Sequence, residues 1–303
     1  MAAPAQQDVR TALLLALSGF ATLSIGDALV KTMAGQWPGT AVAMLRYSAA
    51  ALGLALLVLL IEGREAFRIP KPWLQLGRGI GVSVATICFF LGVMAIPLAD
   101  ATAIQFTSPI ITAMLAPLFL KERTTRAVWL AMALAFAGVL VVLRPNVLAL
   151  GGAALYPVGA AAGMACLMIC NRKAAGAASP LAMQFYAALM AAPIITVATL
   201  LLATTSLPQF HIGPPPGSVV VKSLTVACTA TLGHMLIYMA AVRASAALVA
   251  PMTYVQLLVA AGLGWAIWGT VPDLSTFAGA ALIIGGGLLL WHSHKPKVVP
   301  EPE

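Results

Sequence analysis

The chain has 303 residues, of which 61% are hydrophobic and only 9% are charged. Soluble domains average about 25% charged residues, so this composition excludes an ordinary soluble protein and indicates a chain that crosses a membrane many times. The apolar runs do not alternate with polar residues, which excludes a membrane β-barrel. The net charge of +8 comes from Lys and Arg residues between these runs, so we attribute it to membrane topology and not to nucleic-acid binding.

A membrane-spanning helix needs about 20 mostly apolar residues, and ten segments meet this requirement. They cover residues 11–33, 40–61, 72–95, 99–120, 127–144, 152–171, 180–203, 218–241, 245–269 and 274–291. The chain is therefore predicted to be an all-α integral membrane protein with ten transmembrane helices. The polar, proline-rich segment 292–303 is expected to be a disordered cytoplasmic tail.

Basic residues predict the orientation, because cytoplasmic connections of membrane proteins are enriched in Lys and Arg. With the N-terminus in the cytoplasm, every cytoplasmic connection carries basic residues, and the other side carries few. We therefore expect both termini to be cytoplasmic. The basic residues assigned to the cytoplasmic side are Arg10, Arg64, Arg68, Lys71, Arg78, Lys121, Arg123, Arg126, Arg172, Lys173, Arg243, Lys295 and Lys297.

Residues 95–144 form an apolar hairpin around a short charged turn, and the same plan recurs at 240–291. The chain is therefore interpreted as two repeats, 1–150 and 151–291. Five spans per repeat is an odd number, so the repeats insert with opposite orientations. Such inverted repeats build transporters with a substrate site between the repeats near the bilayer midplane. The alignment pairs Ser108 with Thr253, Pro109 with Tyr254 and Gly138 with Gly286.

The fourth span has a polar face, because Gln105, Ser108 and Thr112 recur at helical spacing. Pro109 removes an amide donor and is expected to bend this helix. We interpret the face as one wall of a solute cavity. The alternative is hydrogen bonding between helices, a common role of Ser and Thr in membranes.

The eighth span carries Thr231, His234 and Tyr238 on one face. A histidine inside a membrane is a functional candidate, here for substrate binding or proton transfer. The alternative is a neutral histidine that forms hydrogen bonds between helices.

Two further spans combine aromatic and polar residues, Thr86 and Phe90 in the third and Thr253 and Tyr254 in the ninth. This combination suits a partly apolar solute. For Phe90, core packing or lipid exposure explains the residue equally well.

The first span carries Ser24, Asp27 and Lys31 on one face, and Arg46 lies at a similar depth in the second span. Unpaired charges at this depth are costly, so we expect an ion pair of Asp27 with Lys31 or Arg46. The alternative is a role in gating, or in binding a substrate carboxylate through Arg46.

No paired carboxylates, phosphate-binding loop, metal-ligand cluster or Ser-His-Asp set is recognisable in the sequence. We therefore expect neither enzymatic activity nor a cofactor or metal. The lack of an ATP-binding motif predicts a secondary transporter and not a primary pump.

Three features carry a resemblance to a known family. They are Arg46 early in the second span, Pro109 within the fourth, and the run LFLKERTTRAVWLAMALAFAGVLVVL at 118–143. The chain resembles the EamA family of the drug/metabolite transporter (DMT) superfamily, and within it the YddG-like exporters of amino acids. Glu122 matches the acidic turn residue of that family. The corresponding turn in the second half, at 268–270, lacks an acid.

The resemblance implies a bacterial inner-membrane exporter made of two five-span inverted repeats. It also implies a central cavity lined by the first, third, fourth, sixth, eighth and ninth spans. In the sixth span, Met164 would contribute to an apolar wall. The turn at Lys121, Glu122 and Arg123 is interpreted as a solvated turn that fixes topology.

We therefore predict export of neutral and aromatic amino acids across the inner membrane by alternating access, with broad selectivity and low affinity. The expected partners are small-molecule substrates and the lipid bilayer; nucleic acid is not a partner, and an oligomer is not required. The alternatives are DMT export of a nucleoside, cationic drug or sugar derivative, or a non-transporting scaffold or receptor. The predicted substrate contacts are Ser24, Thr86, Phe90, Gln105, Ser108, Thr112, Met164, Thr231, His234, Tyr238, Thr253 and Tyr254.

Overall fold

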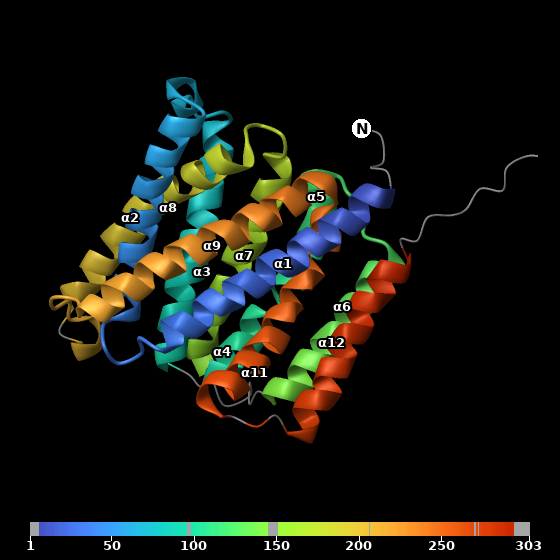
Figure 1. Ribbon diagram of the computed structural model, residues 1–303. Helices are drawn as coiled ribbons and strands as arrows, with labels where there is room; N and C mark the ends of the chain where they lie inside the picture. Colours follow the sequence, from blue (N-terminus) through green and yellow to red (C-terminus); the bar gives the residue numbers. More distant parts are fainter. Residues whose placement is uncertain are drawn as a thin grey trace, which may run out of the picture.

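The computed structural model describes residues 6–95, 98–144, 151–205, 207–269, 271 and 273–293, and within them it is helical with no strand (Figure 1). The long α-helices are α1 (Gln6–Lys31), α2 (Gly39–Ile61), α3 (Pro72–Ala95), α6 (Arg126–Leu143), α7 (Leu155–Lys173), α8 (Pro180–Ala203), α9 (Gly217–Arg243) and α12 (Leu274–Ser293). The shorter elements are η1 (Arg64–Phe67), α4 (Leu98–Gln105), α5 (Ser108–Leu120), η3 (Gly151–Ala154), η4 (Pro208–Phe210), α10 (Ala246–Val249), η5 (Ala250–Tyr254) and α11 (Val255–Trp268).

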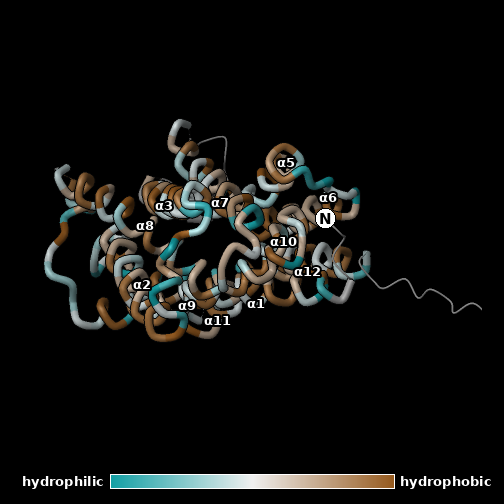
Figure 2. Tube along the Cα trace, turned by 90° about the horizontal axis from the view of Figure 1, so that it is seen from above, coloured by the Kyte–Doolittle hydropathy of each residue, from teal (hydrophilic) through white to brown (hydrophobic). Residues whose placement is uncertain are grey.

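Ten segments of these described residues are long and apolar enough to cross a membrane, which confirms the predicted all-α, ten-span architecture. Hydrophobic residues run along most of the helices, and hydrophilic stretches lie largely in the connections (Figure 2). α12 extends to Ser293, so the first two residues of the expected tail are helical. The rest of that tail lies outside the described residues.

Two of the ten spans are discontinuous. The fourth divides into α4 and α5 at Phe106 and Thr107, and the ninth divides into α10, η5 and α11. Pro109 and Pro251 each lie in the first turn of the segment that follows the break, where a missing backbone N–H is tolerated. The bend expected near Pro109 is therefore present. The sequence did not predict the second break.

The packing of the helices repeats under a two-fold relation. α1 packs against α9 and α3 packs against α7, while α2 pairs with α8 and α6 pairs with α12. If α7 to α12 copy α1 to α6, then α1 corresponds to α7 and α3 to α9, so the first two contacts are copies of each other. The other two contacts join each helix to its own copy, as expected for two repeats related by a two-fold axis.

The α1–α9 and α3–α7 contacts are both glycine crossings. A Cβ atom on Gly19 would come within 2.8 Å of the Gly233 carbonyl oxygen, and one on Gly233 within 2.9 Å of the Gly19 oxygen. In the same way, a Cβ atom on Gly81 would come within 2.9 Å of the Gly163 carbonyl oxygen, and one on Gly163 within 2.6 Å of the Gly81 oxygen. Small residues let helix backbones approach this closely in membranes. Two equivalent glycine pairs thus hold the halves together.

The α6–α12 pair lies at one edge of the bundle (Figure 1). Gly138 faces the Gly279 carbonyl, so the glycine-rich faces of these spans pack against each other within the chain. At the start of α12, hydrogen bonds from the Ser275 hydroxyl and from the Thr276 amide and hydroxyl lower the pKa of Asp273 to about 2. Asp273 also pairs with Arg144 at the end of α6.

One end of the bundle holds both the start of α1 and the end of α12, because the Arg10 guanidinium lies 5.0 Å from the centre of the Trp291 ring. We call this end the N-terminal face and the other end the opposite face. α7 ends at the N-terminal face whereas α1 begins there, as inverted repeats require.

The glycine crossings can be tested by adding bulk. Gly163→Leu and Gly233→Leu place side chains where the partner backbone leaves no room, and each should cost about 1–3 kcal/mol or more of stability. The thermal unfolding midpoint in detergent measures the loss. Gly53→Leu is the matched control, because a Cβ there meets nothing within 4 Å. Equal midpoints for all three variants would contradict the crossing model.

Candidate functional site

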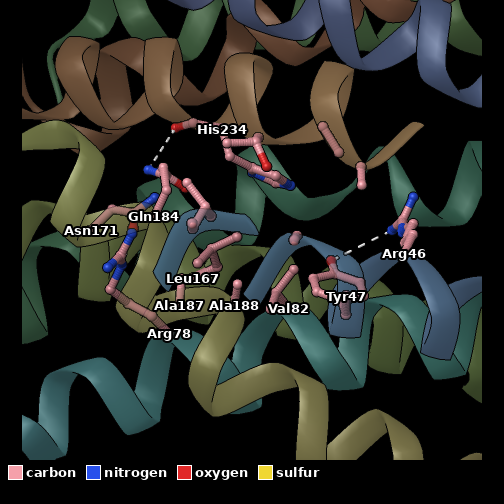
Figure 3. A pocket seen from close by; sticks show the side chains of 15 residues that line it. Arg46, Tyr47, Arg78, Val82, Leu167, Asn171, Gln184, Ala187, Ala188 and His234 are labelled. Carbon is pink, nitrogen blue, oxygen red and sulfur yellow. Dashed lines mark hydrogen bonds between the residues drawn. The ribbon is translucent and has the colours of Figure 1, made fainter. Parts of the chain in front are cut away.

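A cavity of about 50 Å³ lies between α2, α3, α7, α8 and α9, so both repeats contribute to it (Figure 3). Two arginines lie at opposite ends of this central cavity, with His234 between them. No carboxylate is among the lining residues. They are Arg46, Tyr47, Ala50, Leu54, Arg78, Val82, Leu167, Asn171, Gln184, Ala187, Ala188, Ala227, Ala230, Thr231 and His234.

Arg78 anchors one end of the cavity. It is 1% exposed, and its Nε donates to Asn171 Oδ1 at 2.6 Å. Its Nη1 donates to Gln75 Oε1 at 2.7 Å and to the Met183 carbonyl at 2.6 Å. The guanidinium also lies over the Tyr238 ring at 5.5 Å. A buried cation is tolerated only when its donors are satisfied, and these contacts tie α3, α7, α8 and α9 together.

Arg46, at the other end, is far less satisfied. Its Nε is buried without a hydrogen-bond partner. Its Nη2 donates a long hydrogen bond, 3.5 Å, to the Tyr47 hydroxyl, and the guanidinium lies 4.9 Å from the centre of the Tyr47 ring. The Tyr47 hydroxyl in turn approaches Thr86 Oγ1 at 3.4 Å. Arg46 Nε therefore lacks a protein acceptor, whereas Nε and Nη1 of Arg78 both donate to protein acceptors.

Two residues predicted from the eighth span, Thr231 and His234, line this cavity from α9. The His234 carbonyl accepts a hydrogen bond from Gln184 at 3.4 Å. The lining of the cavity holds two arginines and no carboxylate, a charge distribution that gives the cavity a positive potential. Such a potential favours an anionic group and opposes a cation.

A second cavity, of about 10 Å³, lies where the two broken spans approach each other. It joins predicted residues from both repeats, since Ser108 and Thr112 meet Thr253 and Met164 there. The Thr112 hydroxyl donates to the Ser108 carbonyl at 2.9 Å, and the Thr253 hydroxyl donates to Gln256 Oε1 at 3.1 Å. The remaining lining residues are Phe20, Pro109, Met168 and Ala250.

The other predicted contact residues line neither cavity. Gln105 lies on α4, and the break at Phe106 and Thr107 separates it from Ser108 and Thr112 on α5. The prediction of one continuous polar face was therefore wrong. Ser24 donates to the Gln256 carbonyl at 3.0 Å and joins α1 to α11.

Three aromatic candidates are packing residues in this conformation. Phe90 lies against the start of α2, where a Cβ on Gly39 would meet its ring at 2.9 Å. The Tyr238 hydroxyl donates to the Ala174 carbonyl at 3.2 Å. Tyr254 packs edge-on against Phe106 at 6.0 Å between ring centres, and its buried hydroxyl has no partner.

The expected ion pair of Asp27 is not formed in this structure. Among the described residues, the ion pairs within 4.0 Å are Arg68–Glu65, Arg144–Asp273 and Arg172–Glu122. Asp27 interacts electrostatically with Arg46 without such a contact. Lys31 instead lies over the Trp268 ring at 4.4 Å.

The sequence interpretation missed the polar cluster around Arg78. It assigned Arg78 to the basic residues of a cytoplasmic connection, whereas the residue is buried inside α3 with Asn171 and Gln184 nearby. A signal was present, because Arg78 lies six residues inside the span that begins at Pro72, about 9 Å along a helix. Its partners come from distant helices and could not be identified by spacing.

Glu122 is also more than a solvated turn residue. Its side chain and that of Arg172 are each 18% exposed, and Arg172 Nε donates to Glu122 Oε1 at 2.6 Å. The other carboxylate oxygen accepts the backbone N–H of Ala246 at 3.1 Å. The turn after α5 is thereby joined to the end of α7 and the start of α10.

Both cavities are much smaller than the roughly 300–1,000 Å³ of typical small-molecule sites. Neither cavity has room for a metabolite as it stands, so binding of one requires the walls of the cavity to move apart.

The EamA-like transporter family matches this chain twice, at residues 10–144 and 151–291. The chain belongs to the EamA-like transporter family. The two matches coincide with the two structural repeats, and the chain is a transporter of the drug/metabolite type, not an enzyme.

Several curated relatives are transporters. The pseudopaline exporter CntI of Pseudomonas aeruginosa (strain UCBPP-PA14) is 28% identical over 95% of this chain and 98% of its own length. The S-adenosylmethionine uptake transporter of Rickettsia prowazekii is 27% identical over 95% and 94% of the two chains. The riboflavin transporter of Rhizobium johnstonii is 28% identical over 86% and 83%.

A solved crystal structure, whose name states no function, matches with a TM-score of 0.75 at 17% identity. It covers 92% of this chain and 96% of its own. At this identity the similarity establishes the fold alone.

The anchoring role of Arg78 predicts a stability effect without any change of charge. Arg78→Lys keeps the cation, but a single ammonium cannot reach acceptors on α3, α7 and α8 together, so about 2–4 kcal/mol of stability should be lost. Thermal unfolding in detergent measures this loss. Arg68→Lys is the control, because the Arg68 side chain is 84% exposed and its ion pair contributes little. An unchanged midpoint for Arg78→Lys would contradict the anchor.

Proposed function

We propose that this protein is a secondary transporter that exports amino acids and amino-acid-like metabolites across a bacterial inner membrane. In this proposal the two repeats alternate access to the central cavity, with broad selectivity and low affinity. The observation that carries it is the cavity shared by both repeats, with an incompletely paired arginine and no carboxylate among its lining residues.

A free carboxylate on the substrate would complement Arg46. Guanidinium groups bind carboxylates with short, charge-assisted hydrogen bonds, and Arg46 Nε is a buried donor without a partner. The rest of the wall includes Ala50, Leu54, Val82 and Leu167, which suit an aliphatic or aromatic side chain. A neutral amino acid would place its carboxylate at Arg46 and its side chain on the apolar wall, and its ammonium group would need the neutral oxygens of Thr231 and Gln184 as acceptors.

The same features disfavour a cationic drug, one of the alternatives. Arg46 and Arg78 make the cavity positive, and Asp27, the acid that a cation would need, does not line it. One relative is named for S-adenosylmethionine, an α-amino acid derivative that also carries a sulfonium cation. The names of the relatives include both an exporter and an uptake transporter. We propose export because the sequence resembles exporters of this family.

The proposed orientation puts the N-terminal face in the cytoplasm. Basic residues gather at this face, among them Arg64 and Arg68 near η1, Arg123 after α5 and Arg243 at the end of α9. This distribution follows the positive-inside rule.

Once the halves separate, we propose that Thr231 and His234 contact the substrate beside Arg46, with Ser108, Thr112, Met164 and Thr253 lining the deeper part of the path.

Counterflow in proteoliposomes tests the proposal. Labelled neutral amino acids should accumulate, and Arg46→Gln should raise the half-saturating concentration about tenfold or more, because one hydrogen bond to a charged group is lost. Arg46→Lys should restore part of the affinity. Arg68→Gln is the control, since that exposed residue does not line the cavity and should leave transport unchanged.

Competitors separate the substrate classes in the same assay. An amino acid should inhibit counterflow, whereas its carboxamide, which lacks the carboxylate, should inhibit about tenfold more weakly. Equal inhibition by both compounds would contradict carboxylate recognition. Counterflow of nucleosides or sugar derivatives that is insensitive to Arg46→Gln would favour the alternative substrates.

A further inference from the structure

Asp27, the acid of the first span, has no ion-pair or hydrogen-bond partner among the described residues. No basic group of that part of the chain lies within 4.0 Å of its carboxylate, and no hydrogen bond reaches it. Lys31, one turn further along α1, lies over the Trp268 ring at 4.4 Å instead. An ionisable residue inside a membrane protein is costly unless it pairs or has a function, so Asp27 requires an explanation.

Asp27 points into the bundle and is accessible there. It shares a helix face with Phe20 and Ser24, seven and three residues earlier, and both of these side chains are buried. Leu14 and Ile25 lie on the other side of α1, where they are exposed toward the position of the lipid. Asp27 is exposed although it lies on the buried face. Its carboxylate is therefore reached from the interior of the bundle, near the end of α1 at the opposite face.

The carboxylate of Asp27 also lies close to the Arg46 end of the central cavity. A Cβ atom on Gly26 would come within 2.9 Å of the Thr229 hydroxyl oxygen on α9, and the next residue of α9, Ala230, lines the cavity together with Arg46. Asp27 and Arg46 interact electrostatically without an ion-pair contact. Two opposite charges from α1 and α2 are thus near each other but held apart, and each has binding capacity left.

We propose that Asp27 binds the ammonium group of an α-amino acid whose carboxylate is bound by Arg46, so that the two charges together recognise the zwitterion. This role rests on the proposed function, because it assigns a second contact to the same substrate. The carboxylate and ammonium of an α-amino acid are attached to one carbon atom, so the groups that bind them must be close without touching each other. Asp27 and Arg46 meet this condition, whereas an ion pair between them would occupy both.

The charge of Asp27 adds what the lining of the central cavity lacks. That lining offers an ammonium group only neutral oxygens, such as those of Thr231 and Gln184. Hydrogen bonds between two charged groups are roughly twice as strong as neutral ones. When the walls of the cavity move apart, Asp27 supplies the charged acceptor.

The pair of charges also determines which solutes are rejected. A carboxylic acid without an ammonium group is attracted by Arg46 but repelled by Asp27. A cation without a carboxylate is attracted by Asp27 but repelled by Arg46. Unfavourable contacts of this kind contribute to specificity as much as favourable ones do. Only a zwitterion satisfies both residues.

Inhibition of phenylalanine counterflow in proteoliposomes tests this role. The two inhibitors are unlabelled phenylalanine and 3-phenylpropanoate, which has the same carboxylate and aromatic ring but no ammonium group. In the parent chain, phenylalanine should inhibit about tenfold or more strongly than 3-phenylpropanoate, because a hydrogen bond to a charged acceptor is lost in the second compound.

Substitution of Asp27 should remove this preference. Asp27→Asn should weaken inhibition by phenylalanine about tenfold and leave inhibition by 3-phenylpropanoate unchanged or stronger, since the repelling charge is gone. Asp27→Glu, which keeps the carboxylate, should retain part of the preference. Asp8→Asn is the matched control, because Asp8 is an exposed acid in the first turn of the same helix and should change neither inhibitor. Thermal unfolding in detergent verifies that each variant folds.

Three results would overturn the role of Asp27. One is equal inhibition by the two compounds in the parent chain, a comparison that requires no variant to fold. Another is a folded Asp27→Asn variant that keeps the full preference for phenylalanine. The third is a variant that weakens both inhibitors equally, which would make Asp27 a structural residue.

The effect of Arg46→Gln separates this inference from the proposed function. If Arg46→Gln weakens both inhibitors while the Asp27 variants leave the preference intact, carboxylate binding stands and only ammonium binding by Asp27 fails. If no amino acid exchanges in the parent chain, both the proposed function and the role of Asp27 are wrong.

Discussion

The close approach of helix backbones at two glycine crossings is the constraint on which the rest of this structure depends. Gly19 with Gly233 and Gly81 with Gly163 bring one helix of each repeat against a helix of the other. In a bilayer the hydrophobic effect does not draw helices together, so dispersion contacts between small residues must do so. These crossings place α3, α7 and α9 around a common space, and the central cavity lies there.

The cavity shows how one residue type can serve two purposes. Arg78 is surrounded by neutral acceptors from three helices, which satisfies a charge that would otherwise be prohibitively costly to bury. Arg46 has only its neighbour Tyr47 and a buried Nε without a partner. A satisfied arginine holds helices in place, whereas an incompletely satisfied one has binding capacity left for a ligand. The difference comes entirely from the surroundings, since both residues lie about two turns inside a span.

The two repeats share their glycine crossings but differ in the turns that follow α5 and α11. The glycine pairs are equivalent in both repeats, but the turn after α5 places Glu122 against Arg172, whereas the turn after α11 places Asp273 against Arg144. A symmetric scaffold with unequal contacts at its two faces has unequal energies for its two open states.

The sequence alone determined the class of this protein. Ten apolar runs, basic residues at alternate connections and a repeated hairpin were sufficient for an inverted-repeat transporter, because the bilayer allows so few solutions for a polypeptide. Helical spacing also identified Thr231 and His234 on the face of α9 that lines the cavity, and Ser108 and Thr112 on α5. The tertiary structure alone decided the rest. Spacing along one helix cannot reveal that Arg78 meets Asn171 or that Glu122 meets Arg172, because these partners are separated by 93 and 50 residues and come together only when the two repeats pack.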